Sequence, residues 1–201
     1  MPKINPLNVL LICGSTREPS HTRTNLKEIE RLLLEKEGVT THFWDLREKV
    51  LPIADPAYHK KPREHPDERV GKLVSLAGDA HAFVLGTPLY HNSYSGVLKN
   101  TLDHLTIREF DGKPVGIVAH GSERTVVQAC DHLRIVVRGL AGVAIPMQIA
   151  TIQTDFRESP SGNYLLNNQD IHHRMALMVD QLVFFTNQLT PPESDLLRFK
   201  K

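Results

Sequence analysis

The stretch LNVLLICGSTREPS, residues 7–20, decides the fold class of this chain. Its first half is an apolar run centred on Val9-Leu10-Leu11-Ile12, which is too short to span a bilayer and has the length of a buried strand. Its second half is a loop rich in hydroxyl groups, and apolar residues at three- and four-residue spacing follow it as far as Leu33. A buried strand that leads through a polar loop into a helix is the opening unit of a parallel α/β sheet.

The rest of the chain repeats this alternation of apolar strands and helix-period segments. A long loop carrying four prolines is expected at 45–66, and Pro146 predicts an edge position for the last strand because proline cannot donate to the hydrogen-bond ladder. We therefore predict a flavodoxin-like three-layer α/β sandwich with a five-stranded parallel sheet of order 2-1-3-4-5. After the first strand, the others are predicted at 40–44, 82–86, 115–119 and 143–149.

The composition is that of an ordinary globular protein, with 40% apolar and 23% charged residues in 201. This length suits a single domain over residues 1–201, with a core at about 7–190 and loose ends at 1–6 and 191–201. A formal net charge of +1 gives no reason to expect a nucleic-acid or membrane partner. Without signal-peptide features, we expect a cytoplasmic protein. Cys13 and Cys130 have no metal or redox spacing, and no metal site is expected.

Ligands of such sheets bind at the carboxyl ends of the strands, near the point between the first and third strands where the order reverses. The first loop there offers the hydroxyls of Ser15, Ser20 and Thr22, and Arg17 adds a charge that can contact a phosphate in bidentate fashion. The helix that follows presents free N–H groups. The loop contains neither a Walker motif nor G-x-G-x-x-G, which favours one terminal phosphate over the pyrophosphate of NAD. The alternative is a polar loop that only caps the helix.

The loops after the third and fourth strands are the other candidates. In the former, Pro88 stiffens the backbone and the rings of Tyr90 and Tyr94 supply aromatic surface, which suits a flat, amphipathic ring system. The alternative there is a turn followed by a serine cap. In the latter, Gly121 permits close approach of a ligand to the backbone, and His120 can donate a hydrogen bond to a ring carbonyl. A purely structural histidine is the alternative for His120.

Taken together, these loops carry a family resemblance. The segments Gly14-Ser15-Thr16-Arg17-x-x-Ser20 and Thr87-Pro88-Leu89-Tyr90-x-x-Ser93-Tyr94-Ser95-Gly96-Val97-Leu98-Lys99-Asn100 are similar to those of NADPH-dependent FMN reductases, especially the flavin reductases that partner sulfonate monooxygenases. The resemblance covers about residues 9–150 and implies FMN as cofactor and NAD(P)H as co-substrate. It assigns Ser15, Arg17, Ser20 and Thr22 to the FMN phosphate, and it places Thr87, Pro88, Leu89, Tyr90, Tyr94, Ser95, His120 and Gly121 at or near the isoalloxazine.

The resemblance implies an oxidoreductase that passes hydride from NAD(P)H through bound FMN to a flavin, quinone, azo, nitro or similar small-molecule acceptor, as a homodimer or homotetramer. No side chain is expected to be an indispensable acid or base, because the flavin itself stores the electrons. Gly121-Ser122 replaces the family's frequent Gly-Gly pair, and the lack of an inserted residue within 124–140 favours a tightly held flavin.

Two alternatives of other classes stay open at this point. The first is a flavodoxin-like electron carrier, although such carriers are usually strongly acidic and this chain is nearly neutral and places Arg17 in the phosphate loop. The second is a specialised FMN-dependent dehydrogenase or oxidase of one metabolite, which would use the same phosphate loop.

Overall fold

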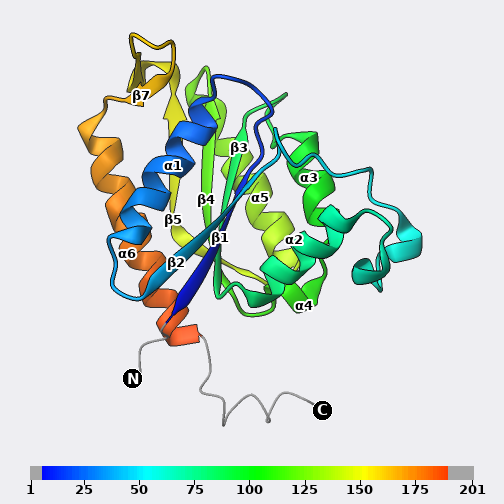
Figure 1. The fold of residues 1–201 in the computed structure, drawn as a ribbon. Coiled ribbons are helices and arrows are strands. Elements are labelled where there is room, and N and C mark those ends of the chain that lie inside the picture. The colour runs from blue at the N-terminus through cyan, green and yellow to red at the C-terminus, as the bar shows by residue number, and fades with distance from the viewer. Residues whose placement is uncertain (1–5, 190–201) are drawn as a thin grey trace.

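The computed structural model describes residues 6–189, so the expectation of loose ends concerns residues that, apart from Pro6, lie outside this range. Five parallel strands form one sheet in the order β2-β1-β3-β4-β5, which confirms the predicted topology (Figure 1). The strands are β1 (Leu7–Cys13), β2 (Val39–Asp45), β3 (Ala82–Pro88), β4 (Pro114–Gly121) and β5 (Val143–Ile152).

Helices cover both faces of the sheet. The first and last helices pack on one face, and the helices in between pack on the other (Figure 1). No helix within residues 6–189 is both long and apolar enough to cross a membrane. The α-helices are α1 (His21–Leu34), α2 (Glu68–Asp79), α3 (Gly96–Asp103), α4 (Ile107–Phe110), α5 (Val127–Gly139) and α6 (Gln169–Leu189).

The central strand β1 explains why its apolar run is continuous. Val9 and Leu11 join the core beneath α1 and α6, whereas Leu10 and Ile12 join the core on the opposite face. All four side chains are fully buried. A strand with helices on both faces has no solvent side, and burial of each such side chain contributes roughly 1.5–3 kcal/mol.

Pro146 lies on an edge strand, as the sequence predicts, and its surroundings are irregular. Val115 of β4 pairs with Ala144 of β5, whereas Ile117 pairs with Gln148, so β5 advances four residues where β4 advances two. The carbonyl of Pro146 accepts a hydrogen bond from Nη2 of Arg134 at 3.1 Å. The bulge therefore removes from the ladder the segment that holds the proline.

Two local features differ from the expectation. The segment 45–66 contains two short 3₁₀ turns, η1 (Pro56–Tyr58) and η2 (Pro62–Glu64), in place of an irregular loop throughout. A small antiparallel hairpin of β6 (Phe156–Glu158) and β7 (Tyr164–Leu166) follows β5. Three-residue strands are too short to show a two-residue periodicity, which is why the sequence pattern missed the hairpin. The remaining short turns are η3 (Arg124–Val126) and η4 (Gln153–Asp155).

Candidate functional site

A cavity of about 510 Å³ lies at the carboxyl ends of β1, β3 and β4. The three loops singled out from the sequence meet there, because parallel strands end at the same edge of the sheet. A larger hollow of about 700 Å³ lies between 59–64 and the α4 region, but none of the predicted site residues lines it. The predicted residues that line the 510 Å³ cavity are Ser15, Arg17, Ser20, Thr22, Pro88, Leu89, Tyr90, His120 and Gly121.

The other three predicted residues, Thr87, Tyr94 and Ser95, do not line this cavity. The Thr87 hydroxyl is fully buried and accepts the backbone N–H of Ser95 at 2.9 Å. The Ser95 hydroxyl donates to the carbonyl of Gly14 at 2.7 Å and caps the N-terminus of α3. Tyr94 packs against the core on the side of the sheet that holds α3. In the structure Ser95 thus connects the loop after β1 to the loop after β3, Thr87 holds Ser95 within the latter loop, and the alternative of a serine cap holds for Ser95.

The start of α1 supplies donors to the cavity. Ser20 is its N-cap, and its hydroxyl accepts the backbone N–H of Arg23 at 3.2 Å. The preceding N–H groups have no partner within a helix, and no acidic residue stands in this first turn. Ser15, Ser20 and Thr22 are all buried at the cavity wall, whereas Arg17 is exposed. Such an end attracts anions.

The opposite wall is formed by two loops in close contact. The backbone N–H of Leu89 donates to the carbonyl of His120 at 2.7 Å, which continues the β3–β4 pairing beyond the sheet. A Cβ at Gly121 would stand 3.1 Å from Cβ of Leu89, closer than most such contacts. Glycine at 121 therefore lets the two loops approach, and Tyr90, 42% exposed, stands at the rim.

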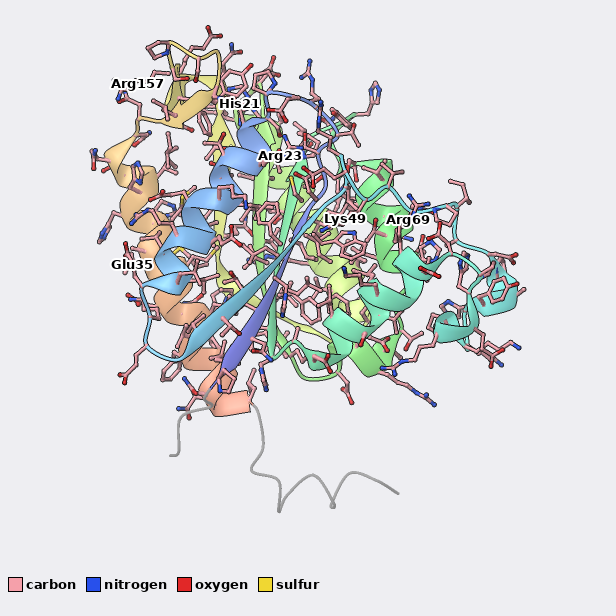
Figure 2. The ribbon with its side chains drawn as sticks, viewed as in Figure 1. His21, Arg23, Glu35, Lys49, Arg69 and Arg157 are labelled. Carbon is pink, nitrogen blue, oxygen red and sulfur yellow. The ribbon has the colours of Figure 1, made fainter. Side chains whose placement is uncertain are left out.

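The structure adds cavity residues that sequence reasoning missed, above all His21 and Tyr164. The ring of His21 lies between those of Tyr164 and His120, with centroid distances of 3.5 and 4.1 Å and interplanar angles of 12° and 13°. Phe156 meets His21 edge-on at 4.6 Å. No local pattern could pair His21 with Tyr164, because the β6–β7 hairpin brings the tyrosine to the start of α1 (Figures 1 and 2).

His120 is held by buried polar groups. Its Nδ1 lies 3.1 Å from Oγ1 of Thr151, and that oxygen also accepts from Nδ2 of Asn25 at 2.7 Å. Burial, with smaller contributions from nearby His21 and Arg17, lowers the pKa of His120 to about 3. Burial also lowers the pKa of His21. The His120 ring is therefore neutral near pH 7 and offers the cavity a hydrogen-bonding group without charge.

We expect the buried His120 to make folding weaker in acid. Its folded pKa of about 3 lies below the ordinary 6.5, so the unfolded chain binds the proton first as pH falls. The contribution of this group to stability is full above pH 6.5 and is lost as pH falls from there towards 3. Between pH 7.5 and 5.5 this amounts to about 1.4 kcal/mol. Urea unfolding at both pH values should show a smaller pH dependence for His120→Asn than for the wild type.

The matched control is His173→Asn, which changes an exposed histidine on α6. This variant should keep the wild-type pH dependence. Equal pH dependence in His120→Asn and the wild type would show that His120 does not resist protonation in the folded state.

The donor set of the cavity fits an FMN phosphate. Buried hydroxyls, one exposed guanidinium and a helix N-terminus suit a single phosphate dianion. The carboxylate of Glu18 also lies at the cavity wall, but its negative charge is paired with Arg23 at 2.9 Å. The opposite wall of Pro88–Tyr90 and Gly121 offers rigid backbone and an aromatic ring to a flat ligand. A volume of about 510 Å³ is in the usual range of cofactor sites.

Comparison with known proteins agrees with this geometry. The family model of NADPH-dependent FMN reductases matches residues 7–156. An FMN-dependent NADPH-azoreductase of Staphylococcus saprophyticus is 39% identical over 176 residues, which cover 88% of this chain and 93% of that protein. The apo structure of an NADH:FMN oxidoreductase aligns with a TM-score of 0.72 at 19% identity, covering 94% of this chain and 92% of that one.

A second solved structure, an FMN-dependent NADH-azoreductase from Bacillus anthracis in complex with FMN, aligns with a TM-score of 0.62 at 14% identity and covers 88% of this chain and 99% of that one. At such identities the two structural likenesses show the fold alone. The family match carries more weight, because it extends over all five strands of the sheet and ends before α6. By that match and by the identity with the staphylococcal enzyme, this chain belongs to the NADPH-dependent FMN reductase family.

Proposed function

We propose that this protein is an FMN-dependent NAD(P)H oxidoreductase whose acceptors include azo compounds, with quinones, nitro compounds and free flavin as further candidates. The observation that carries the proposal is the convergence of nine predicted residues from three separate loops on one cavity at the start of α1. The acceptor class is taken from the staphylococcal relative, which is named as an FMN-dependent NADPH-azoreductase and is aligned over 93% of its length.

In this proposal the side chains bind and orient, and FMN, when bound, supplies the hydride chemistry. Ser15, Arg17, Ser20 and Thr22 hold the phosphate. The backbone of Pro88–Tyr90 and Gly121 supports one side of the flat ring, and neutral His120 presents a hydrogen-bonding nitrogen to it. No residue of the cavity is assigned the role of an acid, a base or a nucleophile, because positioning of two stacked reactants suffices for hydride transfer.

The test is a steady-state assay of NADPH and NADH oxidation by the FMN-saturated protein across a panel of azo dyes, quinones, nitroaromatics and free FMN. We expect turnover with at least one azo dye and almost none before FMN is added to the apoprotein. Addition of FAD or riboflavin to the apoprotein should restore much less activity than FMN, because the phosphate site suits one terminal phosphate. Absence of NAD(P)H oxidation with every acceptor at saturating FMN would refute the proposal.

The protein is proposed to form a homodimer or a homotetramer. The family resemblance and the prevalence of twofold symmetry among oligomers support this, as does the exposure of large apolar side chains, of which Ile53 is 83% exposed. Light scattering at micromolar concentration should give at least twice the chain mass of 22.7 kDa. A mass equal to that of one chain would contradict the proposed dimer.

We also propose that one domain carries the whole site and that the enzyme acts in the cytoplasm. Cys13 and Cys130 are both buried and free, which suits a reducing compartment, and the NAD(P)H that the reaction consumes is available there.

A further inference from the structure

Arg23 is a cation in the first turn of α1, where anionic side chains are the favourable choice. Its side chain is only 15% exposed, so it is not a solvated surface charge. Figure 2 shows Arg23 at the same end of α1 as His21, which lines the cavity. Yet Arg23 does not line the cavity itself. Because a positive charge is unfavourable at this position of the helix, we expect Arg23 to be retained for its contacts with groups outside α1.

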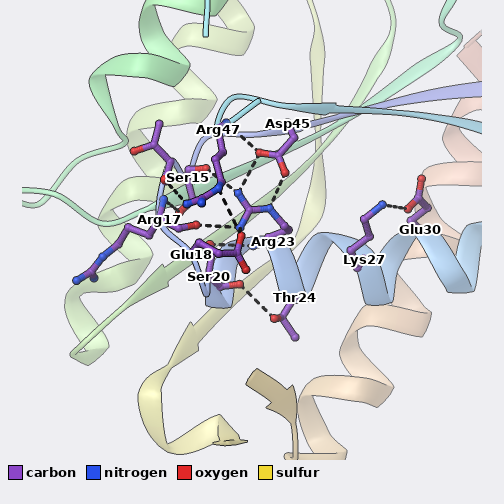
Figure 3. A network of polar contacts seen from close by, with 11 residues as sticks. Ser15, Arg17, Glu18, Ser20, Arg23, Thr24, Lys27, Glu30, Asp45 and Arg47 are labelled. Carbon is purple, nitrogen blue, oxygen red and sulfur yellow. Dashed lines mark hydrogen bonds and ion pairs between the residues drawn. The ribbon is translucent and has the colours of Figure 1, made fainter. Parts of the chain in front are cut away.

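The guanidinium of Arg23 bridges the phosphate loop and the end of β2 (Figure 3). Its Nε and Nη2 bind the two carboxylate oxygens of Asp45 at 2.5 and 3.1 Å, which is a bidentate pair. Its Nη1 donates to the carbonyl of Arg17 at 2.9 Å and to the carboxylate of Glu18 at 2.9 Å. Its Nη2 also reaches the carbonyl of Ser15 at 3.4 Å. The guanidinium of Arg23 therefore donates hydrogen bonds to two carboxylates and two loop carbonyls.

A second guanidinium extends this pattern. Nη1 of Arg47 lies 3.4 Å from the carbonyl of Thr16, and the backbone N–H of Arg47 donates to Asp45 at 3.0 Å. Three consecutive loop carbonyls, those of residues 15–17, thus accept from arginines anchored at the end of β2. In a planar trans peptide the N–H points opposite to the C=O. The N–H groups of Thr16 and Glu18 therefore point away from Arg23.

We propose that Arg23 is a positioning residue of the phosphate loop: locked by Asp45, it holds the loop carbonyls of Ser15 and Arg17 away from the bound phosphate. This rests on the proposed function, in which that loop binds the FMN phosphate. Arg23 and Arg17 then have different roles in the phosphate loop. The charge of Arg23 is balanced by Asp45 and Glu18, whereas Arg17 extends away from this network and keeps its charge for the ligand (Figure 3).

The test compares the dissociation constants of FMN and of riboflavin, which lacks the phosphate, for the apoprotein and its variants. Arg23→Gln should weaken FMN binding about tenfold, the effect of losing about one hydrogen bond between the displaced loop and the phosphate, and should leave riboflavin binding nearly unchanged. Arg23→Lys keeps the charge but cannot form the fork, so it should recover only part of the loss. Arg31→Gln, which removes an exposed pair with Glu28 on the same helix, should change neither constant.

A double-mutant cycle separates positioning from direct phosphate binding. If Arg23 and Asp45 act as one unit, Asp45→Asn weakens FMN binding, and the double variant Arg23→Gln, Asp45→Asn is no worse than the single ones. If Arg23 bound the phosphate itself, release from Asp45 would make FMN bind more tightly. Tighter binding by Asp45→Asn would therefore overturn the proposal.

Amide hydrogen exchange of the ligand-free protein gives a readout that needs no FMN. The segment 15–18 should exchange faster in Arg23→Gln and Arg23→Lys than in the wild type, with α2 unchanged. A wild type that binds FMN no better than riboflavin would contradict the proposed phosphate site. A wild-type preference for FMN that persists in both Arg23 variants, with unchanged exchange at 15–18, would overturn only the role of Arg23. Arg23→Lys serves if Arg23→Gln fails to fold.

Discussion

Arg17→Ala is expected to raise the dissociation constant of FMN about ten- to a hundredfold, because it removes a charge-assisted hydrogen bond worth roughly 1.5–3 kcal/mol. Arg17 is exposed and lines the cavity, and within residues 6–189 no carboxylate forms an ion pair with it. The fold should therefore not need this side chain, and the melting temperature should stay within about a degree of the wild type. Isothermal titration of the apoprotein with FMN measures the effect.

The loss should be confined to the phosphate. Riboflavin should bind Arg17→Ala as it binds the wild type, and Arg17→Lys should recover FMN binding only in part, since an ammonium cannot contact two phosphate oxygens in parallel. Arg69→Ala is the control, because Arg69 is an exposed arginine of α2 that pairs with Asp67 away from the cavity. An FMN dissociation constant that stays the same in Arg17→Ala would remove Arg17 from the phosphate site.

Gly14→Ala is expected to lower the free energy of unfolding by about 3 kcal/mol, the upper end of the usual cost of overpacking. A Cβ at this position would stand 2.7 Å from the carbonyl oxygen of Gly86. The same oxygen accepts the backbone N–H of Gly14 at 2.7 Å, so β1 and β3 would have to separate where they meet the cavity. Because Ser15 follows directly, FMN binding should weaken as well. Urea unfolding monitored by circular dichroism gives the stability.

Gly71→Ala is the matched glycine control. A Cβ at Gly71, inside α2, meets no atom within 4 Å. Alanine is a better helix former than glycine, so this variant should be more stable than the wild type by up to about 1 kcal/mol. A Gly14→Ala protein that unfolds at the wild-type urea midpoint would show that β1 and β3 can separate without cost.

The sequence alone determined the sheet and the sheet edge at which the cavity lies. Four of the five strands are short, largely apolar runs, β2 is the mixed segment Val39–Asp45, and apolar residues at helical spacing mark the long helices. This alternation indicates a parallel α/β sheet, and the flavodoxin-like order expected for five strands is the order β2-β1-β3-β4-β5 that the structure contains. Pro146 identified the edge strand by its missing N–H. These sequence patterns are local, because each depends only on residues within one strand or helix and on whether a face of that element is buried away from water.

Tertiary structure alone decided which polar side chains face the cavity. Thr87 and Ser95 belong to the same motif as Pro88 and Tyr90, yet their hydroxyls are buried in hydrogen bonds to backbone groups, Thr87 within that motif and Ser95 to Gly14 of the loop after β1. His21 acquires a stacking partner from a hairpin more than a hundred residues away in the chain. Neither outcome has a local signature, because a short loop can direct a polar side chain inwards or outwards with the same sequence pattern.

Arg23 illustrates the same limit for charges. In the sequence it is one more basic residue at the start of a helix, and its partner Asp45 is 22 positions away at the end of another strand. The two meet because β2 pairs with β1, which brings the end of β2 beside the loop that leaves β1. Sequence periodicity therefore determines which elements form and how they are ordered. Side-chain partnership depends on distances that exist only once those elements have packed.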